Sequence, residues 1–156
     1  MYQDKFDSAK SAGSSTAGEP LSLARKLNLR VPVVSAPMFL VSGPELVVAA
    51  CKAGIVGAFP TPNARPIEVL DDWMKSITEQ LERAKDEQDP STIGAWCANV
   101  VTHSTNTRLA DDLKLLAKYK PPVVVTALGS HKPVIEVVQD YGGIVIADVI
   151  SLRLAE

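Results

Sequence analysis

Short apolar runs alternate with one-sided amphipathic segments along most of this chain. The first run, VPVVSAPM at residues 31–38, predicts a strand that stops near Pro37, because proline donates no hydrogen bond to a sheet and fixes its own φ angle. Later apolar runs predict four more strands, at residues 55–59, 93–101, 123–128 and 144–149. Uninterrupted apolar runs are typical of strands buried on both faces, so the pattern favours a parallel sheet covered by helices.

The segments between these runs predict helices. In the clearest one, which starts near Pro66, apolar residues recur at spacings of three and four: Ile67, Leu70, Met74, Ile77 and Leu81. Another covers residues 44–53, and Ser42 with Glu45 matches a capping box at its start. Three more are predicted: one from Leu109, with Asp111 and Asp112 facing outward, one capped by Ser130, and one from Ser151.

Five strand–helix repeats fit either a doubly wound sheet or an eightfold barrel, and spacing alone does not choose between them. A (β/α)8 TIM barrel typically needs about 250 residues, and this chain has 156 and ends inside the helix that follows the fifth strand. We therefore expect an α/β fold, a TIM barrel truncated to about the first five βα units, within residues 19–156. Residues 1–18 lack periodicity and predict a disordered tail.

Composition narrows the class of protein. Hydrophobic residues make up 46% and charged residues 22%, with a net charge of −2 and no basic stripe, so we expect a globular protein without a nucleic-acid partner. Apolar runs of about 18 residues, as in a membrane span, and the apolar core of a signal peptide are both missing, so we expect no membrane partner and a cytoplasmic location. Cys51 and Cys97 lack metal-ligand spacing and are interpreted as buried thiols rather than a disulfide.

Ligands in parallel α/β folds bind at the carboxyl ends of the strands. Asn99 lies near such an end and offers a donor and an acceptor to a planar heterocycle, or else ties down a turn. Asp148 ends an apolar strand, so its carboxylate is either exposed at a pocket mouth or paired. His103 and His131 are interpreted as loop or capping residues, and Trp73 and Trp96 as core. Neither a Gly-x-Gly-x-x-Gly motif nor a Walker loop is present.

Five motifs, in this order and spacing, resemble the nitronate monooxygenase family, formerly called 2-nitropropane dioxygenases. The FMN-dependent enoyl-acyl-carrier-protein reductases are close relatives. The resemblance spans residues 21–156, and its motifs are VVSAPM at 33–38, GAFP at 57–60, WCANV at 96–100, VVTALGS at 124–130 and ADV at 147–149.

The resemblance implies a flavin-binding (β/α)8 barrel with FMN across the strand ends. It implies oxidation of an alkyl nitronate, or of the related nitroalkane, to a carbonyl compound and nitrite, with dioxygen as electron acceptor. In this interpretation Ala36, Pro37 and Met38 line the isoalloxazine, Asn99 hydrogen-bonds the flavin, and Asp148 approaches the cofactor.

The catalytic histidine of the family belongs to a Gly-Gly-His stretch after the sixth strand. That stretch lies beyond Glu156, since Gly142 and Gly143 are followed by Ile144, so we assign no catalytic residue. Two alternatives stay open: a non-catalytic truncated fragment, and a relative of the enoyl reductases. We also expect an oligomer that covers the open edge of the sheet.

Overall fold

The computed structural model describes residues 22–155, so the tail expected at residues 1–18 lies outside the described residues. The strands are β1 (Val34–Ser35), β2 (Val56–Pro60), β3 (Trp96–Val101), β4 (Val123–Ala127) and β5 (Ile144–Ala147). The α-helices are α1 (Leu23–Lys26), α2 (Pro44–Lys52), α3 (Ile67–Glu87), α4 (Leu109–Tyr119), α5 (Lys132–Asp140) and α6 (Leu152–Ala155). Two short 3-10 helices, η2 (Thr61–Asn63) and η3 (Pro90–Thr92), follow β2 and α3.

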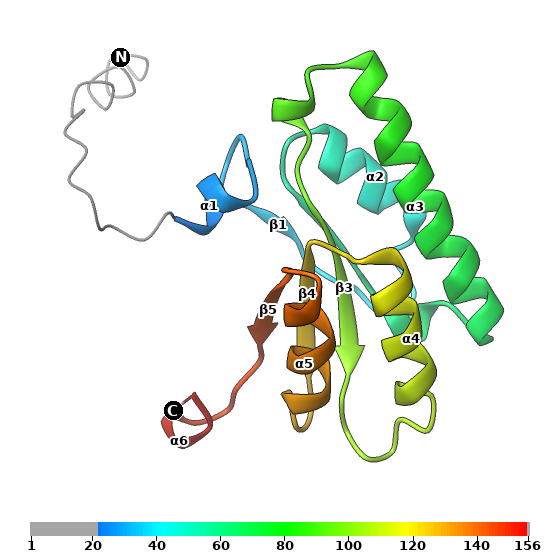
Figure 1. The fold of residues 1–156 in the computed structure, drawn as a ribbon, viewed down its shortest axis with the longest axis vertical. Helices are drawn as coiled ribbons and strands as arrows, with labels where there is room; N and C mark the ends of the chain where they lie inside the picture. Colours follow the sequence, from blue (N-terminus) through cyan, green and yellow to red (C-terminus); the bar gives the residue numbers. More distant parts are fainter. Residues whose placement is uncertain (1–21, 156) are drawn as a thin grey trace.

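The five strands form one parallel sheet in the order β1-β2-β3-β4-β5 (Figure 1). Each connection moves to the next position in the same direction, whereas a doubly wound sheet reverses direction at its switch point. Successive helices α2 to α5 contact one another and lie along one face of the sheet. This arrangement confirms the expected fold class, the first five units of a TIM-barrel architecture.

Each face of the sheet has its own apolar cluster, because side chains alternate along a strand. Trp96, Ala98 and Val100 of β3 pack with the helices in the larger cluster. Cys97 points to the opposite face, which the long helices α2 to α5 leave uncovered, and packs there with Leu27, Val56, Val123 and other apolar residues. The short helix α1, whose C-cap residue is Leu27, thus packs against the sheet from the side without the long helices.

The core of the helix-covered face is built around Phe59, which is fully buried. Its ring lies 5.8 Å from the Trp73 ring in an edge-on arrangement and 6.5 Å from the Trp96 ring in a stacked one. Both tryptophans therefore serve as core residues, as predicted. Close packing continues at Gly57, where an added Cβ would overlap the Val47 carbonyl group, so only glycine lets α2 approach β2 this closely.

The prediction that the first apolar run is buried on both faces is wrong. β1 has only two residues, and Val34 is 47% exposed. The reason is that β1 and β5 are the edge strands and each has one neighbour among the described residues, whereas every residue of β2, an inner strand, is buried. The predicted oligomer that covers such an edge stays a prediction.

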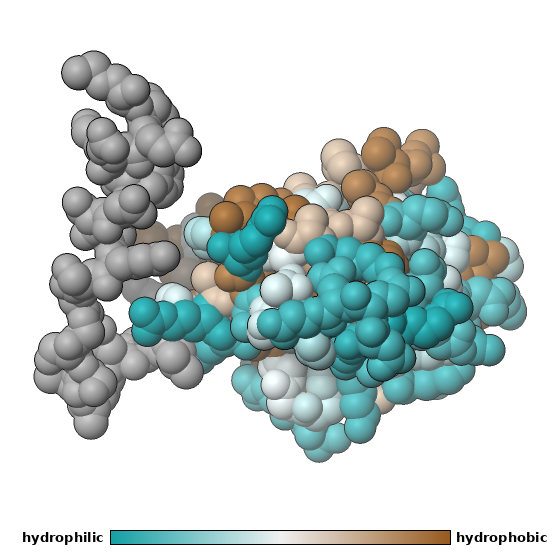
Figure 2. Space-filling view, turned by 90° about the horizontal axis from the view of Figure 1, so that it is seen from above, coloured by the Kyte–Doolittle hydropathy of each residue, from teal (hydrophilic) through white to brown (hydrophobic). Residues whose placement is uncertain are grey.

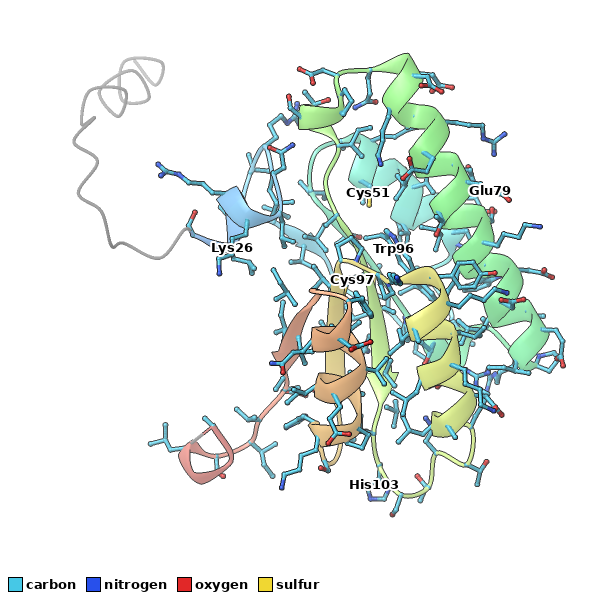
Figure 3. All side chains as sticks on the ribbon, in the orientation of Figure 1. Lys26, Cys51, Glu79, Trp96, Cys97 and His103 are labelled. Carbon is cyan, nitrogen blue, oxygen red and sulfur yellow. The ribbon has the colours of Figure 1, made fainter. Side chains whose placement is uncertain are left out.

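The two cysteines are free and buried, on α2 and on β3 (Figure 3). Burial raises the pKa of the Cys51 thiol to about 11 and that of Cys97 to about 12. Both thiols are therefore protonated at neutral pH and act as small apolar groups, as predicted.

One face of the molecule is mostly polar. Figure 2 shows hydrophilic residues over most of the face seen from above, with hydrophobic residues gathered in separate patches. Within residues 22–155, no helix combines the length and the apolar character needed to span a bilayer.

The aromatic cluster generates a prediction about stability. Phe59→Ala should lower the free energy of unfolding by about 3–5 kcal/mol, because it leaves a cavity between two indole rings. Urea denaturation measures the change. Phe39→Ala is the matched control, since Phe39 is 58% exposed, and should lower that free energy by less than about 1 kcal/mol. Equal losses in the two variants would contradict the packing described here.

Candidate functional site

Among the site residues predicted from the sequence, Asn99 lies on β3, whereas Ala36, Pro37 and Met38 follow β1 and Asp148 follows β5. Ser35, Gly57 and Trp96 are register partners on β1, β2 and β3. The last residue of β1 is therefore level with Trp96, and Asn99 lies three residues further along β3 toward its carboxyl end. His103 marks the loop beyond the end of β3 in Figure 3.

Asn99 lies on the same face of the sheet as Cys97, opposite the long helices, because it follows Cys97 by two residues along β3. Its register neighbours are Pro60 on one side and Val125 on the other, and neither side chain carries a hydrogen-bonding group. The Asn99 Oδ1 atom is buried without a hydrogen-bond partner in the described part of the chain. An unpaired buried acceptor costs about 1–3 kcal/mol, so native proteins rarely keep one without a purpose.

The loop after β1, residues 36–43, is held by its own hydrogen bonds. The Met38 N–H donates to the Ser42 hydroxyl oxygen at 3.0 Å, and that hydroxyl donates to the Ala36 carbonyl oxygen at 3.4 Å. The predicted capping box is therefore wrong: Gly43 is the N-cap of α2, without a side-chain cap, and Ser42 instead closes the loop. Ala36 is exposed, Pro37 half-buried and Met38 41% exposed, so this loop offers apolar side chains more than free backbone donors.

Asp148 lies apart from this loop. Asn99 on β3 pairs in register with Val125 on β4, which pairs with Ile146 on β5. Asp148 therefore lies two residues, about 7 Å, beyond the level of Asn99 in the direction of the carboxyl ends. It lines a cavity of about 680 Å³ together with His103, His131 and apolar residues of the β4–α5 loop, and Asn99 is not part of that lining. The structure thus places Asn99 on β3 and Asp148 beside a separate cavity, and the roles predicted for both residues stay predictions.

The two histidines are held by threonines. His103 Nδ1 lies 3.0 Å from the Thr105 hydroxyl oxygen within the β3–α4 loop. His131 Nδ1 lies 2.7 Å from the hydroxyl oxygen of buried Thr126. Ser130 was predicted to cap α5, but His131 occupies the N-cap position and its ring turns to β4 instead. Within residues 22–155, histidine, cysteine and carboxylate side chains form no group that could hold a metal ion.

A buried ion pair between Arg108 and Asp112 stabilises the carboxyl edge of the sheet, and the sequence pattern did not predict it. Asp112 was predicted to face outward, but its side chain is only 1% exposed, with one carboxylate oxygen 2.9 Å from Arg108 Nε. Its other oxygen accepts from the Thr61 hydroxyl at 3.2 Å. A signal was present, because Asp112 follows Leu109 by three residues and precedes Leu116 by four, which places it on the inward face of α4.

Arg108 joins two loops through the remaining donors of its guanidinium. Nη1 donates to the Ala64 carbonyl oxygen at 2.6 Å and Nη2 to the Thr61 carbonyl oxygen at 2.7 Å. The β3–α4 segment therefore holds both ends of the turn that follows β2. Burial raises the pKa of the Asp112 carboxyl, while Arg108, Asn106 and Thr61 act to lower it.

The residues present fit part of an FMN site. The isoalloxazine ring is a planar heterocycle that carries an N–H donor, which matches the unpaired Asn99 acceptor. The exposed Met38 side chain, in the loop after β1, offers an apolar, polarizable contact for such a ring. The phosphate group of a cofactor such as FMN is commonly bound in TIM barrels by the loops after strands seven and eight.

Comparisons with known proteins agree on the fold. FabK from Thermotoga maritima matches with a TM-score of 0.68 and 20% sequence identity over 88% of this chain. A mutant form of the same FabK matches with the same score and identity. This chain spans 40% of the first structure and 42% of the second, so it corresponds to about two fifths of their length. Neither a family model nor a curated protein sequence matches.

The ion pair generates a second prediction. Asp112→Ala should lower the free energy of unfolding by about 3–5 kcal/mol, because Arg108 would keep a partly buried charge without a partner. Asp111→Ala is the matched control, since the exposed Asp111–Lys114 pair should contribute less than about 1 kcal/mol. Chemical denaturation compares the two variants, and a small loss for Asp112→Ala would refute the role of the pair.

The raised pKa of Asp112 generates a third prediction. Between the ordinary carboxyl pKa, about 4, and the raised value, the folded protein holds a proton that the unfolded chain releases. The stability that Asp112 contributes is therefore fully present below the ordinary pKa and falls as pH rises through this range. Asp112→Asn keeps the shape and removes the titration, so the wild-type stability minus that of this variant should decrease with rising pH. Denaturation at a series of pH values measures the difference, and an increase would show a lowered pKa.

Proposed function

We propose that this chain forms the flavin-facing N-terminal part of an FMN-dependent oxidoreductase that converts alkyl nitronates to carbonyl compounds and nitrite with dioxygen. The single observation that carries the proposal is the buried, unpaired Asn99 oxygen at the carboxyl edge of a barrel-type sheet. The order of the five motifs, including VVSAPM and WCANV, supports it.

FMN, when bound, supplies the electron-accepting ring that the amino-acid side chains lack. The chain's own residues bind and orient that ring. Asn99 accepts a hydrogen bond from the ring, and Met38 covers part of it with an apolar side chain. Ala36 and Pro37 shape the loop that carries Met38, and Asp148 is proposed to approach the cofactor from β5.

The fold-level likeness to FabK favours a second candidate, the FMN-dependent enoyl-acyl-carrier-protein reductase branch of the resembled family. The two candidates differ in the source of electrons. A nitronate delivers electrons from the substrate itself, whereas a reductase takes them from a reduced nicotinamide cofactor.

Incubating the purified chain with FMN tests the proposal. Stoichiometric binding with an altered flavin spectrum is the expected result. Nitrite release from a primary or secondary alkyl nitronate in air is expected only from a protein that also carries the Gly-Gly-His stretch implied by the resemblance, since this chain is expected to be incomplete for catalysis. Rapid reduction of the flavin by NADH or NADPH, with no nitrite, would favour the reductase. A chain that binds no FMN would refute the flavin-binding role proposed for its residues and would favour the non-catalytic fragment.

Asn99 allows a sharp test of its own. Asn99→Leu removes the buried unpaired acceptor at nearly constant volume, so the variant should unfold at a higher temperature while its dissociation constant for FMN rises about tenfold. A turn-forming asparagine would instead lose stability and leave flavin binding unchanged. Thermal melting and fluorescence titration with FMN measure the two effects, and Cys97→Val, on the same face, controls for repacking.

A further inference from the structure

Asn63, the last residue of η2, joins the turn after β2 to the loop after β1. Its Oδ1 accepts from the Leu40 N–H at 3.0 Å. Its Nδ2 donates to the carbonyl oxygens of Met38 and Ser42, each at 2.9 Å. One amide thus uses its oxygen and both hydrogens on a single loop more than 20 residues earlier in the chain.

Apolar packing contributes little to the conformation of the 36–42 loop that Asn63 binds. Phe39, Leu40 and Val41 are 58%, 72% and 67% exposed, so they bury little apolar surface. Leu40 also has a φ angle of 63°, in the left-handed region that a leucine rarely adopts. A strained and exposed backbone keeps one conformation only where specific hydrogen bonds impose it, and Asn63 supplies three of them.

The backbone on both sides of Asn63 is itself held by hydrogen bonds from Arg108. The carbonyl groups of Thr61 and Ala64, on either side of it, are both bound by the Arg108 guanidinium. Arg108 is in turn paired with buried Asp112. The position of the Asn63 amide is therefore set by the core of the domain and not by solvent-exposed chain.

We propose that Asn63 is a positioning residue for the flavin site: it fixes the 36–42 loop, and with it the position of Met38 beyond the carboxyl end of β1. This inference rests on the proposed function, because the ring that Met38 and Asn99 share is the flavin. Asn63 does not contact the ring itself. It acts through the loop, so its loss should change loop dynamics first and flavin binding as a consequence.

The test compares Asn63→Asp with a matched control. The aspartate keeps an acceptor for the Leu40 N–H but sets a negative charge against the Met38 and Ser42 carbonyl oxygens. Asn28→Asp is the control, because Asn28 also donates from Nδ2 to a backbone carbonyl, that of Ser91 at 2.6 Å, away from the 36–42 loop. Asn63→Ala, which removes all three bonds, is the second variant should the aspartate prevent folding.

Two readouts are measured on the full 156-residue chain. Hydrogen–deuterium exchange without flavin should quicken about tenfold at residues 38–42 in the Asn63 variants and stay unchanged in Asn28→Asp. The dissociation constant for FMN should rise about tenfold, with a shifted spectrum of the bound flavin, in the Asn63 variants only. Unchanged exchange, or unchanged affinity and spectrum in a folded Asn63 variant, would overturn the proposal.

Failure of the proposed function gives a different result. In that case the wild-type chain binds no FMN, and the role of Asn63 toward a flavin falls with it, whatever the exchange shows. If the wild type binds FMN and only the Asn63 variants fail to respond, the positioning role alone is refuted.

Discussion

The buried pair of Arg108 and Asp112 is the interaction on which the carboxyl edge of this sheet depends. A carboxylate taken out of water is stable only with a close partner and further hydrogen bonds, and Asp112 has an arginine and the hydroxyl of Thr61. The same arginine binds two backbone carbonyl groups of the turn after β2. One ion pair thereby ties two consecutive βα units into a single rigid edge.

That rigidity supports features which reduce stability. The edge keeps an unpaired acceptor on Asn99, leucines at positions 40 and 128 with positive φ angles, and a run of exposed apolar side chains. Each is unfavourable by itself, and together they lie where ligands bind in parallel α/β folds. Local violations of this kind are typical of functional sites, where a well-packed remainder compensates for them. Here the remainder is the Phe59–Trp73–Trp96 cluster and the closely packed β2.

Repeating features of the fold were predictable from the sequence, because they follow from periodicity. The apolar stripe from Ile67 to Leu81 specified α3, and the runs after Pro121 and Gly143 specified β4 and β5.

Side-chain partners were not predictable in the same way. Ser42 lies next to the start of a helix in the sequence, yet its hydroxyl oxygen accepts a hydrogen bond from Met38 in the preceding loop. The sequence pattern does not indicate a role for Asn63, because its three hydrogen-bond partners lie on another unit of the chain. Asp112 was predicted to face outward because a charge on a helix is ordinarily solvated, whereas here Arg108 and Thr61 compensate for its burial.

The strand order has a consequence for how the chain reaches its structure. Every strand pairs with the one before it and every long helix packs on its predecessor, so no later segment has to insert between two earlier ones. A nascent polypeptide leaving the ribosome amino terminus first can therefore add its units one after another as they emerge. Each new unit then meets its partner in the unit just made, so no search among distant partners is needed.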